Sequence, residues 1–250
     1  MNNLKQRINN DEVTIGSWLQ LPSRESAVIM ANQDFDWLTI DAEHGLFDLQ
    51  NIAAIVDAIH SKSCSALIRI PECNGIWIRR CLDAGVDGII VPMVNDKSIA
   101  EEAIRYCKYP PLGERGFGFS HTNCYGADFQ SYVKEANDKT TLIVQIEHIK
   151  GVENIDSILS LEEIDGVIIG PYDLAGSMGH TGQPDHPEVK KACLDILAGC
   201  QRHNKAPGIH VVKNDISAVK EEIAKGFKFI AYGIDALFLG AAGNSLKELK

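Results

Sequence analysis

The amino-acid sequence predicts an α/β fold, a (β/α)8 TIM barrel built as a single domain from residues 1–250. Eight short apolar runs recur along the chain, and amphipathic helical patterns separate them. Strand and helix alternating to a count of eight is typical of a closed parallel barrel, and the chain has the usual length of one. A doubly wound open sheet is the alternative, because strand order cannot be read from a sequence. No GxGxxG motif follows the first run, which weakens that alternative.

Each expected strand is a short run of mainly apolar residues, as in parallel strands that are covered on both faces. In chain order we expect strands at Gly16–Leu19, Trp37–Asp41, Ala66–Arg69, Gly88–Pro92, Leu142–Glu147, Gly166–Ile169, Pro207–Val211 and Phe227–Tyr232.

The expected helices carry apolar residues at spacings of three and four, which places these residues on one helix face. They are Leu49–His60, Ile76–Ala84, Ser98–Cys107, Val152–Ser160, Glu188–His203 and Ile216–Lys225. Two segments interrupt the alternation: a Pro- and Gly-rich stretch that includes Pro110–Phe119, and Ala175–Pro187, which is rich in Gly, His and Pro. Long loops inside a compact domain are usually functional.

Composition excludes several classes of function. Lys and Arg number 24 against 34 Asp and Glu, and the resulting charge of −10 argues against a nucleic-acid partner. Seven cysteines, without a CxxC pair, indicate small buried side chains in a reducing cytoplasm. The first residues lack the apolar core of a signal peptide, and no apolar run is long enough to cross a membrane. We therefore expect a soluble cytoplasmic protein.

Polar residues follow several of the expected strands, where barrel enzymes keep their catalytic groups. Glu147 comes after one apolar run and Asp173 shortly after the next. Carboxylate oxygens suit Mg²⁺ or Mn²⁺, which keep further coordination positions for water or substrate. Each acid alone also fits a solvated or salt-bridged rim residue. Two acids on adjacent strands predict a divalent-metal site.

Three more side chains are expected at this rim. His44 follows a strand and has the residue type of a general base, although a structural histidine fits the same position. Arg69 ends a strand and suits an anionic substrate, or an ion pair with a rim acid. Gln145 shares a strand face with Glu147, so its amide either orients a carbonyl or packs. Asp83 ends a helix and could support His44 only if the fold brings them together.

Two other mechanisms lack support in the sequence. A Schiff-base aldolase needs a lysine held in an apolar interior, and no lysine lies within an expected strand except at its margin. No GxSxG motif indicates a serine nucleophile. A metal ion is therefore the better candidate for the electrophile.

The residues at these positions resemble the metal-dependent pyruvate aldolases of the HpcH/HpaI family nearly from end to end. The motifs that carry the resemblance are Ile40-Asp41-Ala42-Glu43-His44, Val91-Pro92-Met93-Val94, Tyr109-Pro110-Pro111-Leu112-Gly113-Glu114-Arg115-Gly116, Val144-Gln145-Ile146-Glu147 and Ile169-Gly170-Pro171-Tyr172-Asp173-Leu174. The resemblance implies a (β/α)8 barrel, assembled as a homohexamer, that takes pyruvate or another 2-oxoacid together with an aldehyde.

The resemblance also assigns roles. It implies that Glu147 and Asp173 bind a divalent ion (Mg²⁺, Mn²⁺ or Co²⁺), which chelates pyruvate through its carboxylate and 2-keto oxygen. It makes His44 the base, supported by Asp83, Arg69 the transition-state arginine and Gln145 a substrate contact. The Gly170-Pro171-Tyr172-Asp173 stretch also binds substrate, in part through its backbone. Tyr172 replaces the usual Ala or Ser, and the residues at 117–123 differ from the commoner pattern. We therefore expect the loop Arg115–Tyr125, with a neighbouring subunit, to influence the choice of aldehyde.

The expected reaction is reversible cleavage of a 4-hydroxy-2-oxoacid to pyruvate and an aldehyde through a metal-stabilised pyruvate enolate. Two alternatives stay open: a lyase for malyl- or citryl-CoA thioesters on the same scaffold, and a barrel that binds a keto acid without catalysis. An enolate-forming enzyme with another outcome, such as decarboxylation, is a third.

Overall fold

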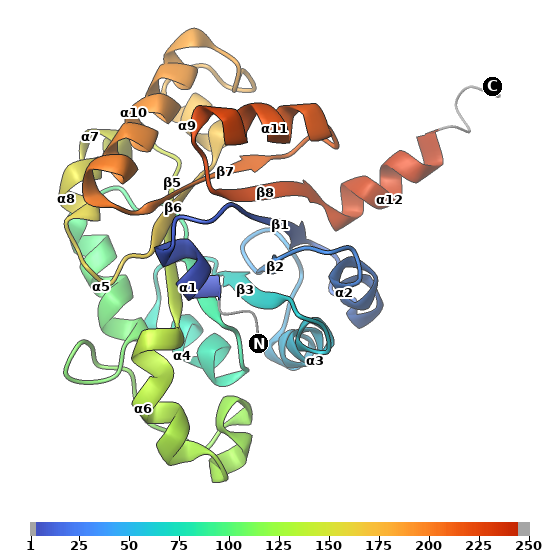
Figure 1. The fold of residues 1–250 in the computed structure, drawn as a ribbon, viewed down its shortest axis with the longest axis vertical. Helices are drawn as coiled ribbons and strands as arrows, with labels where there is room; N and C mark the ends of the chain where they lie inside the picture. Colours follow the sequence, from blue (N-terminus) through green and yellow to red (C-terminus); the bar gives the residue numbers. More distant parts are fainter. Residues whose placement is uncertain (1–3, 245–250) are drawn as a thin grey trace.

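The computed structural model describes residues 4–244, and in this part of the chain eight parallel strands close into a barrel (Figure 1). The strands are β1 (Thr14–Leu19), β2 (Trp37–Asp41), β3 (Ser65–Arg69), β4 (Gly88–Val91), β5 (Thr141–Ile146), β6 (Gly166–Ile169), β7 (Ala206–Val211) and β8 (Phe229–Ile234). Neighbours in sequence are neighbours in the barrel, and β8 closes it against β1. The predicted barrel is confirmed, and the open-sheet alternative is wrong.

Strands β2 and β6 have the expected bounds, and ends of the other strands differ by one or two residues. The largest shift is in β8, which starts at Phe229 instead of Phe227. Phe227 is apolar because it packs into the core beside the sheet, with 1% of its surface exposed, and not because it belongs to the strand. An apolar residue in a sequence can therefore belong to a strand or to the core beside the strand.

The helices that alternate with the strands confirm the expected rhythm. They are α1 (Leu4–Asn9), α2 (Arg24–Ala31), α3 (Leu49–His60), α4 (Gly75–Asp83), α5 (Lys97–Cys107), α6 (Phe129–Lys139), α7 (Ile149–Glu153), α8 (Ile155–Leu159), α9 (Pro171–Ser177), α10 (Pro187–His203), α11 (Ile216–Lys225) and α12 (Asp235–Gly243), with a short 3₁₀ helix η1 (His121–Gly126). The expected helix Val152–Ser160 is instead the end of α7 followed by α8, because Asn154 has non-helical backbone angles. Helices α1, α2, α6, α9 and α12 were not expected.

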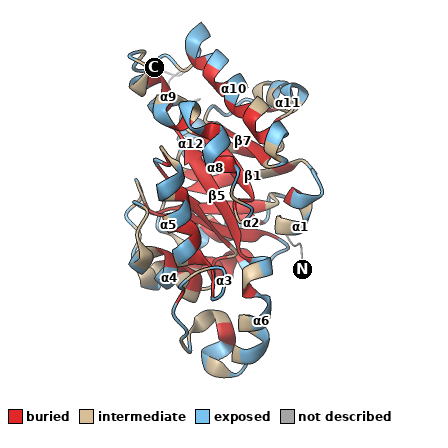
Figure 2. Ribbon diagram, turned by 90° about the vertical axis from the view of Figure 1, so that its left-hand side faces the viewer, coloured by how far each residue is buried: buried red, intermediate tan, exposed pale blue. Residues whose placement is uncertain are grey.

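Two apolar cores hold the barrel together. One lies between the strands and the surrounding helices, and the other fills the barrel interior. Figure 2 shows the central strands largely buried and exposed residues on the helices around them. In the interior, the rings of Trp37 and Phe229 stack with centroids 4.1 Å apart. Gly16 is required beside them, because a Cβ there would overlap the Trp37 ring. Leu4 and Ile8 of α1 join this interior cluster, so α1 closes the amino-terminal end of the barrel. The carboxyl ends of the strands form the other mouth.

The direction of the chain decides what can reach this mouth. A helix that follows a strand returns the chain to the amino-terminal end, so the segment between α5 and β5, with η1 and α6, lies at that end. Helix α12 extends away from the barrel (Figure 1). None of the described helices is long and apolar enough to cross a membrane. The domain assignment over residues 1–250 stays a prediction, since residues 1–3 and 245–250 lie outside the described part.

Candidate active site

A buried ion pair lies at the carboxyl ends of β2 and β3. Asp41 and Arg69 are paired in register, and the Arg69 side chain donates to both carboxylate oxygens, Nε to Oδ1 at 2.9 Å and Nη2 to Oδ2 at 2.8 Å. Gln20 donates to the same carboxylate at 3.1 Å. Burial would raise the pKa of Asp41, but the hydrogen bonds and charge of Arg69 outweigh it and hold that pKa below its ordinary value. Asp41 is therefore a fixed anion that orients Arg69.

Arg69 also contacts Glu43 and Trp18. Its Nη1 lies 3.0 Å from the Glu43 carboxylate, and its guanidinium carbon lies 4.4 Å from the centre of the Trp18 ring. Burial raises the pKa of Glu43, although the charges of Arg69 and His44 oppose the shift. Asp173 adds to the rise, so a third carboxylate is near. The predicted His44, Arg69 and Asp173 thus belong to one charged neighbourhood.

Glu147 lies just past β5 and is almost fully buried. Its Oε1 accepts the backbone N–H of Met93 at 2.8 Å, and its Oε2 accepts a hydrogen bond from the Gln145 amide. Burial raises the pKa of Glu147; these two hydrogen bonds oppose the rise, while the charges of Glu43 and Asp173 add to it. The Oε1 atom of Gln145 is buried without a hydrogen-bond partner. The negative charge of Glu147 therefore lies beside Gln145 Oε1, an acceptor that has no hydrogen-bond donor.

The Gly170–Asp173 segment brings the second predicted ligand to Glu147. Gly170 precedes α9, Pro171 is the first residue of that helix, and Asp173 lies in its first turn. A Cβ on Gly170 would come within 2.7 Å of Glu147 Oε2, so only glycine lets the backbone pass this close to the carboxylate. Tyr172 is partly exposed beside them.

A cavity of about 160 Å³ opens at this mouth and brings most of the predicted residues together. Its lining includes the predicted His44, Arg69, Gln145, Gly170, Tyr172 and Asp173, with Trp18, Gln20, Ile168, Ile169, His210, Val212 and Ile234. Glu147 is not part of this lining, but it contacts Gln145 and Gly170, which are.

Pro171 does not line this cavity, and Asp83 lies away from it. Asp83 ends α4, so it lies at the amino-terminal end of the barrel, and its carboxylate pairs with Arg115 at 2.9 Å. The expected contact with His44 is not made within one chain. Arg115 and the η1 segment lie at that same end, so the loop Arg115–Tyr125 does not line the cavity of its own chain. An influence of either on the reaction would have to come from a neighbouring chain.

Several residues in or beside the cavity have no role predicted from the sequence, among them Gln20 and Glu43. Asp41 ends its strand next to Arg69, so a buried strand-end acid was the available signal. His210 and Trp18 interrupt apolar strands with polar atoms that face the barrel interior. Met93 takes part through its backbone N–H, which the identity of its side chain does not reveal; its φ is +53°.

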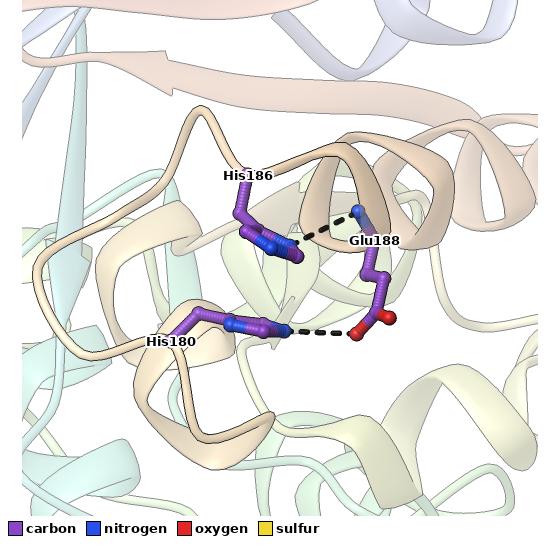
Figure 3. Close-up of side chains that lie close together, drawn as sticks. All are labelled: His180, His186 and Glu188. Atoms are coloured by element: carbon purple, nitrogen blue, oxygen red, sulfur yellow. Dashed lines mark hydrogen bonds and ion pairs between the residues drawn. The ribbon is translucent and has the colours of Figure 1, made fainter.

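A second group of metal-ligand types lies outside the cavity, in the segment between α9 and α10. His180, His186 and Glu188 have ligand atoms within 4.8 Å of one another (Figure 3). His180 Nε2 bonds to the Glu188 carboxylate at 2.8 Å, and His186 Nδ1 accepts the Glu188 backbone N–H at 3.3 Å, which caps α10. The two rings stack with centroids 3.5 Å apart and planes inclined by 17°. Lone pairs in nearly parallel planes do not converge on one ion, so this arrangement fits a helix cap better than a metal centre.

Comparison with known proteins identifies the family. Residues 14–241 match the model of the HpcH/HpaI aldolase/citrate lyase family. The chain belongs to this family. It is 36% identical over 98% of its length to a 4-hydroxy-2-oxovalerate aldolase from Rhodococcus jostii, of which it covers 95%. It is 34% identical over 98% of its length to a hydroxypyruvate/pyruvate aldolase from Roseobacter denitrificans, of which it covers 96%.

A solved structure supports the same conclusion. The HpcH/HpaI aldolase/citrate lyase family protein from Burkholderia cenocepacia superposes with a TM-score of 0.94 at 31% identity, over 100% of this chain and 99% of that one. The sequence-based recognition of an HpcH/HpaI aldolase, an enzyme of the carbon–carbon lyase class, is therefore confirmed.

The cavity of this HpcH/HpaI aldolase fits a divalent cation. Burial raises the pKa values of Glu43 and Glu147, and the charges of the neighbouring carboxylates, Asp173 among them, add to the rise. The nearby cation Arg69 is already bound bidentately by Asp41. Hard carboxylate oxygens are the ligands that Mg²⁺ and Mn²⁺ prefer. A divalent ion would neutralise the remaining negative charge.

Proposed function

We propose that this chain is a divalent-metal-dependent aldolase that reversibly cleaves a 4-hydroxy-2-oxoacid to pyruvate and an aldehyde. The observation that carries the proposal is the shared cavity, which is lined by the carboxylate-bound Arg69, the acid Asp173 and the base candidate His44. The second acid, Glu147, borders this cavity through its contacts with the lining residues Gln145 and Gly170. An anionic oxo acid needs positive charge at such a place, and the chain as a whole is acidic.

Glu147 and Asp173 would hold the ion, which we propose to be Mg²⁺, Mn²⁺ or Co²⁺. When bound, it supplies a Lewis acid for the negative charge that develops on the 2-oxo oxygen. Gln145 has a free acceptor atom, Oε1, and an amide that keeps Glu147 oriented. Gly170 carries no side chain that would crowd the carboxylate of Glu147.

Arg69 would stabilise the same developing charge. Of its five N–H groups, two donate to Asp41, and Nη1 lies 3.0 Å from the Glu43 carboxylate, so further N–H groups remain for substrate oxygen. Because Asp41 fixes the guanidinium before substrate arrives, little reorganisation is needed during the reaction.

His44 would move the proton. In cleavage it accepts the proton of the 4-hydroxyl group as the C4–O bond becomes the aldehyde carbonyl and the C3–C4 bond breaks. The electron pair of that bond passes to the pyruvate enolate, which is then protonated at C3. Condensation follows the same steps in reverse. Tyr172 lines the cavity beside the proposed ligand Asp173, and Pro171 begins the helix that carries both.

The proposal extends to assembly and location. Helix α12 extends from the barrel with Leu237 and Leu239 exposed, which supports a homo-oligomer, and we propose the homohexamer implied by the family resemblance. All seven cysteines are free, and burial raises the pKa of Cys81, Cys107 and Cys200 to about 12. Five of the seven are buried while Cys124 is exposed, and seven unpaired thiols support a reducing cytoplasm.

The test is pyruvate release from a panel of 4-hydroxy-2-oxoacids before and after chelation with EDTA. We expect chelation to abolish turnover and Mg²⁺, Mn²⁺ or Co²⁺ to restore it. Glu147→Gln should raise the metal concentration that gives half-maximal turnover by more than about tenfold. Glu188→Gln, an acid in the helix-cap cluster of Figure 3, is the matched control and should leave it unchanged.

Three results would contradict the proposal. Turnover that persists in EDTA excludes the metal, and a lysine adduct trapped by borohydride with pyruvate indicates a Schiff base instead. Cleavage of a malyl- or citryl-CoA thioester, without activity on free hydroxy-oxoacids, would assign the cavity to the acyl-CoA lyase alternative.

A further inference from the structure

His210 is a buried histidine in the cavity wall that the proposed mechanism does not use. It lies on β7, where Ile209 and Val211 pack in the core between the barrel and the helices. Because side chains alternate along a strand, His210 faces the barrel interior, and it lines the same cavity as Arg69 and Gln145.

The contacts of His210 fix its tautomer. Its Nε2 lies 3.1 Å from the carbonyl oxygen of Gly233, which can only accept a hydrogen bond, so Nε2 carries the proton. Burial lowers the pKa of His210 to about 4, against the opposing effect of this hydrogen bond. The ring is therefore neutral near pH 7, and its Nδ1 has a lone pair and no proton.

The orientation of the ring is also fixed. His210 stacks on Trp18, with ring centroids 5.2 Å apart and planes inclined by 16°, and Trp18 in turn contacts Arg69. Within residues 4–244, no donor bonds to Nδ1, and this atom is not fully buried, in a residue that lines the cavity. A pre-oriented acceptor thus borders the space that the substrate occupies.

We propose that His210 determines specificity by accepting, at Nδ1, a hydrogen bond from a hydroxyl group of the substrate. The inference rests on the proposed aldolase function and names the substrate class: a hydroxylated reactant. A neutral acceptor does not attract a carboxylate or a carbonyl oxygen, whereas an O–H group satisfies it. A methyl group in place of the hydroxyl would desolvate Nδ1 without a partner, which disfavours deoxygenated substrates.

The hydroxyl group that His210 recognises belongs to one of two reactants. It is carried either by C3 of the oxo acid or by the carbon next to the aldehyde group. The first arm compares kcat/KM for hydroxypyruvate and 2-oxobutanoate with one common aldehyde. The second compares glycolaldehyde and propionaldehyde with pyruvate. Each pair exchanges O–H for CH₃ at nearly constant size, so its ratio measures hydroxyl preference.

The variant His210→Phe keeps a ring to stack on Trp18 and removes the acceptor. We expect it to lower the hydroxyl preference by about tenfold to a hundredfold in one of the two arms. His210→Asn places an oxygen near the Nδ1 position and should restore part of the preference. Val212→Ala, which enlarges the same cavity without removing an acceptor, should change both members of a pair together.

An unchanged preference in both arms for His210→Phe would overturn the proposal, as would equal loss in His210→Phe and His210→Asn. Calorimetric dissociation constants for hydroxypyruvate and 2-oxobutanoate, measured with Mg²⁺, separate this proposal from the aldolase proposal. If the wild-type protein binds both acids without turnover, the aldolase proposal fails. The ratio of their dissociation constants in His210→Phe then still decides the role of His210.

Discussion

Removing Arg69 should cost stability as well as activity, because its partner Asp41 has no exposed surface. Arg69→Ala leaves that carboxylate buried without its two charge-assisted hydrogen bonds. Breaking a buried pair from one side typically costs about 3–5 kcal/mol. At about 2–4 °C per kcal/mol for a chain of this size, the melting temperature should fall by about 6–20 °C. Arg69→Lys should also lose turnover, since an ammonium cannot reproduce the bidentate geometry.

The sign of the pH dependence provides a sharper test. In the wild-type protein the pKa of Asp41 is depressed, so its ionised form stabilises the fold above the unfolded pKa, and this contribution is lost as pH falls through the folded pKa. In Arg69→Ala, burial without the arginine raises the pKa of Asp41. The buried carboxylate then destabilises the fold at neutral pH, and this destabilisation disappears as Asp41 becomes protonated at lower pH. The stability difference should therefore be widest near pH 7 and shrink toward about pH 4.

Urea unfolding of both proteins in EDTA, at matched protein concentration between pH 4 and 7, measures this difference. Arg105→Ala is the control: Arg105 pairs with Glu102 on the surface, and the change should cost less than about 1 kcal/mol. The double variant Asp41→Asn/Arg69→Ala should regain part of the stability. A difference for Arg69→Ala that is below about 1 kcal/mol, or that does not vary with pH, would refute the assignment of a buried compensated pair.

Two more predictions concern turnover and metal affinity. His44→Ala should reduce the rate of pyruvate release by about 10²–10⁴-fold while the protein stays folded by circular dichroism, and a near-wild-type rate would remove His44 as the base. Gly170→Ala should weaken metal affinity measured by calorimetry, because its Cβ would come within 2.7 Å of Glu147 Oε2; an unchanged affinity would show that Glu147 is not a ligand. Gly118→Ala is the matched control, since a Cβ there meets nothing within 4 Å.

The sequence predicts which strand ends carry chemistry but not which side chains touch. Asp41 and Arg69 both end apolar runs, and their pairing depends on β2 and β3 being neighbours in register, which only the closed barrel settles. His210 was overlooked because one histidine in an apolar strand resembles an ordinary core residue. Its significance arises from Gly233 and Trp18, which come from other strands.

The expectation for Asp83 shows a different limit. The end of its helix was predicted to within one residue, yet the chain direction places that end opposite the cavity. Helix α9 is not predicted from the sequence because it is short. It follows Gly170 and begins at Pro171, and both residue types are also typical of turns. Its first turn nevertheless carries Asp173, one of the two proposed ligands.

The closure of the barrel floor by α1 bears on how the protein can be handled. Leu4 and Ile8 pack among the interior side chains, so α1 lies at the end of the barrel opposite the cavity. Immobilisation on a resin through an amino-terminal peptide would therefore leave the cavity facing the bulk solution. Truncation into α1, by contrast, would uncover Trp37 and Phe229 to water, and we expect aggregation rather than a smaller working enzyme.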